Sequence, residues 1–190
     1  MLMIISIIVG VFILFSLYAM YVQIIKKRNN AKESMSGIDV QLRKRYDLIP
    51  NILAIAAKFM EHEKGLMTEI TELRTQAASI RSDADTIGKK IELDNAITSK
   101  MSQLMVNVEN YPQLKSDQTM IQAMQTYSEV EEHIAAARRF YNSAVKDLNN
   151  SVEIFPSSLV AALIGVKSCP FFETDNTARQ PISAEEYFEK

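Results

Sequence analysis

The first 25 residues form one unbroken apolar run. Residues 1–25 contain no charged side chain, and Lys26, Lys27 and Arg28 follow at once. As a helix this run is about 37 Å long, enough to cross a hydrocarbon core of about 30 Å. It lacks the basic start and the A-x-A cleavage site of a signal peptide. The pattern therefore predicts a retained transmembrane anchor over 1–25.

A helical stripe of apolar residues begins soon after the anchor. From Ile38 to Met60, apolar residues recur every three or four positions, which is typical of an amphipathic helix. The stripe keeps its phase across Pro50, so we expect a proline-kinked helix rather than two helices. The alternative, in which Pro50 occupies the first turn of a new helix, stays open.

Three further stripes predict three further helices. Asp85 is expected to cap the middle one, because its side chain can accept a hydrogen bond from the first helical turn. Pro112 should stop that helix, because proline disfavours helical geometry in the residue before it. The predicted helices cover residues 66–80, residues 87–108, and the long stretch from Ser116 or Asp117 to Pro156.

Helices with narrow apolar stripes bury them against one another, and short links favour an antiparallel arrangement. The sequence thus predicts an all-α fold, in which an N-terminal transmembrane helix is followed by an antiparallel four-helix bundle with long helices over 26–156. A short apolar helix or segment over 157–172, stopped by Gly165, is expected to cap the bundle or touch the membrane. Residues 173–190 are predicted to be a polar tail.

The charge distribution predicts the orientation of the body. The whole chain is nearly neutral, with 21 basic and 23 acidic residues, which argues against a nucleic-acid partner. The basic cluster after the anchor places the body in the cytoplasm, with the N-terminus outside, in a single-pass protein of the inner (cytoplasmic) membrane. Basic residues near the membrane favour contact with anionic lipid. Alternatively, Arg43, Lys44 and Arg45 are solvated or paired helix positions.

Motifs that carry chemistry are absent from the sequence. His62-Glu63 begins like a zincin motif, but Leu66 stands where the second histidine is required. A metal site that joins His62 and His133 through Glu63 or Glu129 is a less favoured alternative. Cys169 is the single cysteine, so no intramolecular disulfide can form. We expect no catalytic residue, no metal and no cofactor.

Charged residues close to the stripes suggest a polar network inside the bundle. Asp39, Arg43 and Asp47 lie four residues apart on one helix face, and Glu131 and Arg138 lie seven apart. Because buried charges need partners, we expect some of them to pair between helices, with Asn142 and Asn149 as further polar positions. Solvent-exposed pairs within one helix are the alternative.

Several motifs resemble those of the bacterial LemA family. The stretch from Ile38 to Asn51, IDVQLRKRYDLIPN, resembles the family signature, and so do His62-Glu63, Glu109-Asn110 and Phe171-Phe172-Glu173. Met35 and Ser158 depart from the tryptophan and asparagine that are common in the family. The motif positions expected to matter are Asp39, Arg43, Arg45, Asp47, Pro50, Tyr111, Pro112, Arg138, Tyr141, Asn142, Asn149 and Pro156.

The resemblance implies an N-terminally anchored, mostly four-helix protein without an established catalytic residue. Family relatives include a protein needed for magnetosome membrane formation, which points to membrane organisation. We therefore expect a scaffold or adaptor that binds membrane lipid and protein partners of unknown identity. The alternative is an accessory or regulatory subunit of membrane-protein quality control or envelope signalling, with a site completed by its partner.

Self-association is expected within the anchor. Ser6 and Gly10 lie four residues apart on one helix face, the spacing of small residues that lets two membrane helices approach closely. The sequence therefore predicts a homo-oligomer. Such a pair also arises by chance in single membrane spans, and this alternative stays open.

Overall fold

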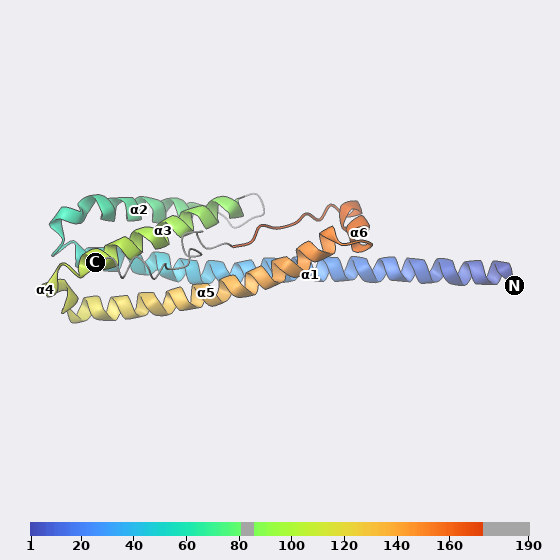
Figure 1. The fold of residues 1–190 in the computed structure, drawn as a ribbon, viewed down its shortest axis with the longest axis horizontal. Helices are drawn as coiled ribbons and strands as arrows, with labels where there is room; N and C mark the ends of the chain where they lie inside the picture. Colours follow the sequence, from blue (N-terminus) through green and yellow to red (C-terminus); the bar gives the residue numbers. More distant parts are fainter. Residues whose placement is uncertain (81–85, 173–190) are drawn as a thin grey trace, which may run out of the picture.

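One long helix runs through the whole molecule. The computed structural model describes residues 1–80 and 86–172. Helix α1, Leu2–Ala56, is 55 residues long, and Figure 1 shows it passing from the isolated N-terminal end into the body. Its apolar window is long enough to cross a membrane, and none of that window is buried. Helix α1 continues through Pro50 as predicted.

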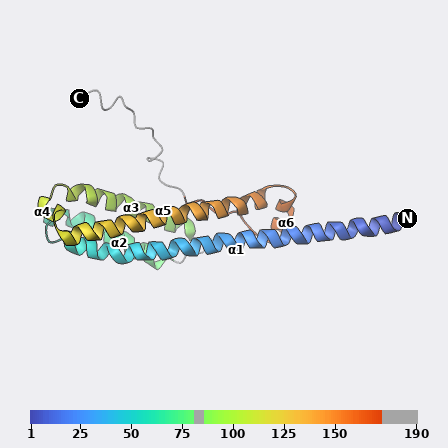
Figure 2. The same ribbon diagram turned by 90° about the horizontal axis from the view of Figure 1, so that it is seen from below.

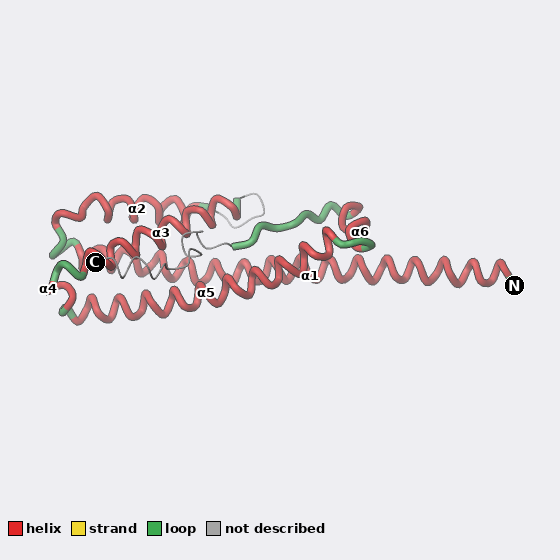
Figure 3. Tube along the Cα trace, in the orientation of Figure 1, coloured by secondary structure: helices red, strands yellow, loops and turns green. Residues whose placement is uncertain are grey.

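The body consists of two antiparallel helix pairs. The C-terminal half of α1 packs along α5, Gln118–Glu153. Helices α2, Lys64–Ser79, and α3, Ile87–Val108, form a shorter pair beside them (Figures 1 and 2). All regular structure in the described ranges is helical, as Figure 3 shows, so the predicted all-α fold is confirmed.

The predicted stripes form the core between these helices. The stripe positions project inward because residues three or four apart share a helix face. The side chains that are at most 1% exposed include Ile38, Leu42, Ile49, Ile52, Ile97, Met101, Leu104, Ile134, Val145 and Leu148. These side chains come from α1, α3 and α5, so one continuous core joins the two helix pairs.

Some helix ends differ from the prediction. Helix α1 ends at Ala56, and Met60 is fully buried in the turn before the short 3-10 helix η1, Glu61–Glu63. Pro112 does more than stop α3, because it opens a short helix α4, Pro112–Lys115. Of the two starts left open for the last long helix, Ser116 and Asp117, the structure has Asp117 as the cap of α5, and its carboxylate accepts from the Met120 amide at 2.9 Å. The expected cap Asp85 lies outside the described residues.

The C-terminal segment returns along the body. A cis bond joins Phe155 to Pro156, and α6 covers Ser157–Leu163. Gly165 ends this turn with φ +67°, a conformation that favours glycine. We call residues 154–163 the elbow and residues 167–172 the strap. Helix α6 packs on α1 and α5 at the end of the body nearest the N-terminal span (Figures 1 and 2).

Candidate functional site

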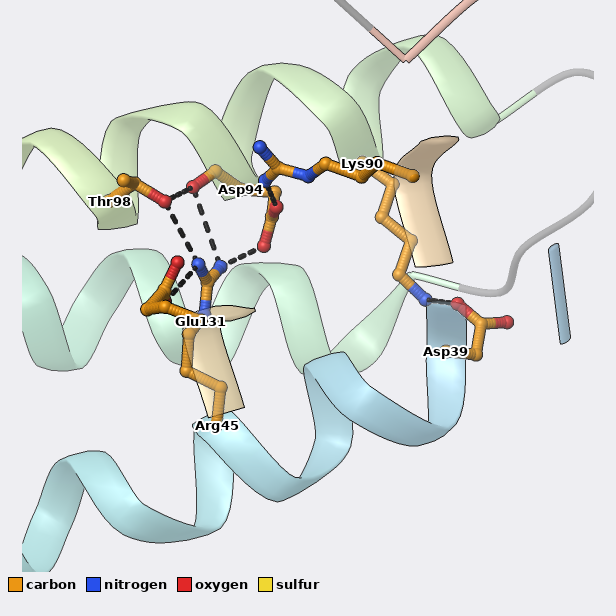
Figure 4. Close-up of polar contacts among 7 residues, drawn as sticks. Asp39, Arg45, Lys90, Asp94, Thr98 and Glu131 are labelled. Atoms are coloured by element: carbon orange, nitrogen blue, oxygen red, sulfur yellow. Dashed lines mark hydrogen bonds and ion pairs between the residues drawn. The ribbon is translucent and has the colours of Figure 1, made fainter. Parts of the chain in front are cut away.

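A charged cluster lies in the middle of the apolar core. The Arg45 side chain from α1 is 0% exposed and forms an ion pair with the equally buried Asp94 of α3. Its Nη1 also donates to Thr98 Oγ1 at 2.9 Å and to Glu131 Oε1 of α5 at 3.0 Å. Figure 4 shows these groups converging from three helices. Arg45 therefore ties α1, α3 and α5 together at one level.

Arg138 adds a second cation to this cluster. Its Nη2 pairs with the second carboxylate oxygen of Asp94, so one carboxylate serves two guanidinium groups. Burial, reinforced by the neighbouring Arg45 cation, lowers the pKa of Arg138, whereas the nearby Glu131 raises it. Glu131 brings a second negative charge to the two cations. Two guanidinium groups thus face two carboxylates, and the cluster is balanced in charge.

A second ion pair extends the polar layer by one helical turn. Lys90 of α3, whose side chain is largely buried, reaches Asp39 Oδ1 of α1 at 2.6 Å (Figure 4). Lys90 and Asp94 lie four residues apart on the same face of α3. Together the two ion pairs oppose any sliding of α3 along α1.

The sequence prediction identified part of this layer. Asp39, Glu131 and Arg138 take part in it, whereas Arg43 and Asp47 are exposed and line an open groove beside α2. Asp94 was not predicted, although the sequence carries a signal for it. Asp94 follows Ile87 by seven residues and Ile91 by three, so a carboxylate falls on an apolar stripe.

Pro50 leaves a polar group for α2 to bind. Proline has no amide hydrogen, so the carbonyl of Tyr46, four residues earlier, receives no helical hydrogen bond from it. Arg74 Nε donates to that oxygen at 2.6 Å. The proline within α1 therefore supports the docking of α2, a role that the spacing alone did not reveal.

Two asparagines hold the strap to α5. The Asn142 amide donates to the Phe172 carbonyl at 3.0 Å and accepts from the Phe172 amide at 2.7 Å. Asn149 makes the same two-way contact with Cys169, with both distances 2.9 Å. Seven residues separate the asparagines, so they lie two turns apart on one face. Each side chain satisfies a main-chain donor and acceptor that the extended strap would otherwise leave open.

The strap also reaches the charged cluster. The Tyr141 hydroxyl donates to the Pro170 carbonyl at 3.0 Å, and its ring meets Phe172 edge to face at 6.4 Å between centroids. Arg138 lies over the Phe172 ring, 4.6 Å from its centroid. Arg138 thus binds Asp94 on one side and the strap on the other. The family-motif residues of α5 act here as one structural unit.

Other motif residues lie at corners of the fold. Tyr111 and Pro112 form the corner between α3 and α4, and Pro156 begins the turn into α6. His62 and His133 are exposed, and Glu63 accepts a hydrogen bond from Asn107 at 2.9 Å. Among the residues described, no group of three His, Cys, Asp or Glu side chains is placed to hold a metal.

The two small residues of the anchor lie away from the body. Ser6 donates within its own helix to the Leu2 carbonyl at 3.0 Å. A Cβ atom at Gly10 would meet nothing within 4 Å. This face of α1 is therefore open to a neighbouring helix or to lipid.

Comparison with known proteins agrees with the motif analysis. The magnetosome protein MamQ 2 of Paramagnetospirillum magneticum is 21% identical to this chain. The alignment covers the whole of this chain and 78% of the relative. Protein LemA of Metamycoplasma hominis is 21% identical over 86% of this chain and 74% of the relative. The LemA family profile matches residues 34–185. This range includes the residues of the charged cluster and the strap. This chain belongs to the LemA family.

Proposed function

We propose that this LemA-family protein is a membrane-anchored scaffold or adaptor without catalytic activity of its own. The observation that carries the proposal is the continuity of α1, which runs without interruption from the apolar span to the charged cluster at Arg45. A body joined to its anchor in this way keeps a fixed orientation to its membrane-spanning segment. Such rigidity suits a protein that positions partners at a membrane.

The location of the charges supports a structural role. Arg45, Asp94 and Arg138 are directed at one another inside the body. Catalytic groups need access to a substrate, usually in a concave pocket. The groove beside α2 is open and lined by surface charges such as Arg43 and Asp47, which suits contact with another macromolecule better than enclosure of a small molecule.

The basic residues after the span support a cytoplasmic body. Lys26, Lys27 and Arg28 follow the uncharged run directly, and such clusters remain on the cytoplasmic side of bacterial membranes. The same residues are placed to meet anionic lipid headgroups. We therefore place the body at the cytoplasmic face of the inner membrane, with lipid as its first partner.

Self-association through the anchor would multiply weak contacts between bodies. The open face at Ser6 and Gly10 allows close approach of two spans. Tethering in the membrane raises the effective concentration of neighbouring bodies, so surfaces of low affinity become occupied. The relatives named as magnetosome proteins fit this role in organising membrane.

Two measurements on the full-length protein test the proposal. Protease added to intact spheroplasts should leave the body undigested, and lysis should make it sensitive. The mass of the protein in nanodiscs and mild detergents should exceed that of one chain. Digestion in intact spheroplasts would contradict the orientation. A strictly monomeric mass under all these conditions would contradict the self-associating scaffold and favour an accessory subunit.

A further inference from the structure

Exposed apolar side chains concentrate in the elbow. Four large ones lie within these ten residues: Ile154 at 58% exposure, Phe155 at 74%, Leu159 at 59% and Leu163 at 86%. Elsewhere in the described body, such residues occur singly, as Val40, Val106 and Phe140 do. Single exposed apolar residues are ordinary, whereas a cluster marks a contact surface.

The register of α5 on α1 sets the level of the elbow. Lys27 Nζ donates to Ser151 Oγ at 2.6 Å, which fixes the two antiparallel helices at this point. Beyond Ser151 the chain continues toward the N-terminal end of α1, by about 1.5 Å for each helical residue. The elbow therefore lies alongside the last residues of the uncharged run.

Burial along α1 leads to the same level. Ile24 is 1% exposed, and Met20 is partly buried against the core, although both precede the first charged residue at Lys26. In Figures 1 and 2, α6 is the element of the body nearest the free span. The body therefore covers α1 within the segment that we assign to the membrane.

The neighbouring side chains are those of a membrane interface. The Tyr18 and Tyr21 rings stack at 6.5 Å between centroids, on the part of α1 that emerges from the body. Lys26 is exposed at the end of the uncharged run, and Glu153 is exposed at the end of α5. Tyrosines belong at headgroup level, and long basic side chains extend from it toward water. This level coincides with the elbow.

We propose that the elbow is a second membrane contact, which places Phe155, Leu159 and Leu163 in the interfacial layer of the leaflet that faces the body. The inference rests on the proposed membrane anchoring of α1 and adds a lipid-binding surface to it. Amphipathic helices lie in this layer with their apolar side chains among the acyl chains. Val160 and Ala161 bind α6 to the body, which leaves the opposite side chains for lipid.

Lipid is the occupant that the geometry favours. A bilayer that surrounds the exposed part of α1 is continuous with the elbow surface, because both lie at one level on the same helix. A second copy of the chain would have to place its body against the elbow. Its own span would at the same time have to stand in the bilayer beside α1. With two attachment points, the body can neither rotate about α1 nor tilt freely from the membrane.

Spin labels on the full-length protein in liposomes test this proposal. Cys169→Ser removes the single cysteine and retains the main-chain contacts to Asn149. In this background, Leu163→Cys and Leu159→Cys carry the label at exposed elbow positions, and Val106→Cys provides an exposed control on α3. Collision with oxygen, which concentrates in lipid, is compared with collision with a water-soluble nickel complex.

The elbow labels should collide mainly with oxygen and the Val106 label mainly with nickel. The ratio of oxygen to nickel collision should therefore be higher at the elbow labels than at the Val106 label, because oxygen concentrates in lipid and the nickel complex stays in water. A label at Ile8→Cys reports on the anchor separately. Oxygen preference at Ile8 together with nickel preference at the elbow would overturn this inference alone. Nickel preference at both would overturn the anchor and the elbow together. Protection from both reagents with spin-spin broadening would show a second copy and overturn it too.

Discussion

Arg74 donates a hydrogen bond from Nε to the main-chain oxygen of Tyr46 at 2.6 Å. The contact joins α2 to α1 at the carbonyl that Pro50 leaves without its helical donor. A residue that ordinarily weakens a helix thus provides a site for the neighbouring helix. This relationship explains how α1 tolerates a proline in its buried half.

The first prediction concerns the coupling of Pro50 and Arg74. Arg74→Met should reduce the free energy of unfolding by about 1–3 kcal/mol, because it leaves the Tyr46 carbonyl without a donor. In a Pro50→Ala background the cost should be smaller, since alanine restores the helical hydrogen bond. Urea unfolding of the four proteins in this cycle, followed by circular dichroism, measures the coupling. Equal costs in both backgrounds would contradict it.

The second prediction concerns the buried cation of α1. Arg45→Met should destabilise the body by about 3–5 kcal/mol, because Asp94 and Glu131 then lose a cation that they share. Arg43→Met is the matched control: Arg43 is exposed two residues away and should change stability by no more than about 0.5 kcal/mol. Thermal unfolding distinguishes the two variants. A loss of stability for Arg45→Met as small as that for Arg43→Met would show that the network contributes little.

The third prediction concerns the strap. Asn149→Ala removes both hydrogen bonds to Cys169 and should release that part of the strap. Burial raises the pKa of the Cys169 thiol, so release should bring the pKa back toward its ordinary value and expose the sulfur. Labelling by a thiol reagent should accelerate about tenfold or more, for a loss of about 1.4 kcal/mol or more. Asn150→Ala, at an exposed neighbouring position, should label at the wild-type rate.

Much of the fold follows from apolar periodicity. The stripes correctly predicted the all-α class and the passage of α1 through Pro50. Short elements were harder to predict, because α4 has four residues and too few apolar positions to establish a period. Sequence position alone could not show that Asp94 binds Arg45, since their pairing depends on how α3 is placed against α1.

The strap illustrates the same limit. Asn142 and Asn149 were recognised as motif residues, and their spacing of seven placed them on one face. Their partners, however, are main-chain groups of Cys169 and Phe172, which any residue type would offer. A hydrogen bond to a main-chain group therefore leaves no trace in the residue type of the partner. The asparagines therefore identified a polar contact without identifying what they contact.

The fourth prediction concerns alkaline pH. Burial raises the pKa of Tyr46 and outweighs the opposing effect of Arg45, and burial raises the pKa of Tyr127 and Tyr141 as well. These phenols keep their protons in the folded state after the unfolded chain has begun to lose them near pH 10. Stability should therefore be unaffected by them below about pH 10 and fall above it, by up to about 1.4 kcal/mol per pH unit for each phenol.

Tyr46→Phe should make this decline less steep. Urea unfolding at neutral pH and above about pH 10 measures both slopes. The lowered pKa of Arg138 has the opposite effect on the slope, and this effect is common to wild type and variant. An identical alkaline slope in wild type and variant would contradict the contribution of Tyr46.

The fifth prediction concerns the anchor. Gly10→Ile should reduce self-association, because an isoleucine side chain keeps two helix backbones apart. The body should remain folded, since nothing in the chain lies within 4 Å of a Cβ atom at this position. Val11→Ile is a control of similar composition on the next residue. Chemical crosslinking in native membranes compares the variants, and undiminished dimer yield for Gly10→Ile would exclude this face.

The length of α1 sets the distance between the apolar span and the far end of the body. From Arg28 to Ala56 the helix rises about 42 Å at about 1.5 Å per residue. The corner at α4 lies at the far end of this rise, on the opposite side of the body from the elbow (Figure 1). If the body stands at the bilayer as proposed, a protein bound at that corner would be held at a set height above the membrane. The proposed scaffold would then act as a spacer whose length is set by the turns of α1 between the membrane and Ala56.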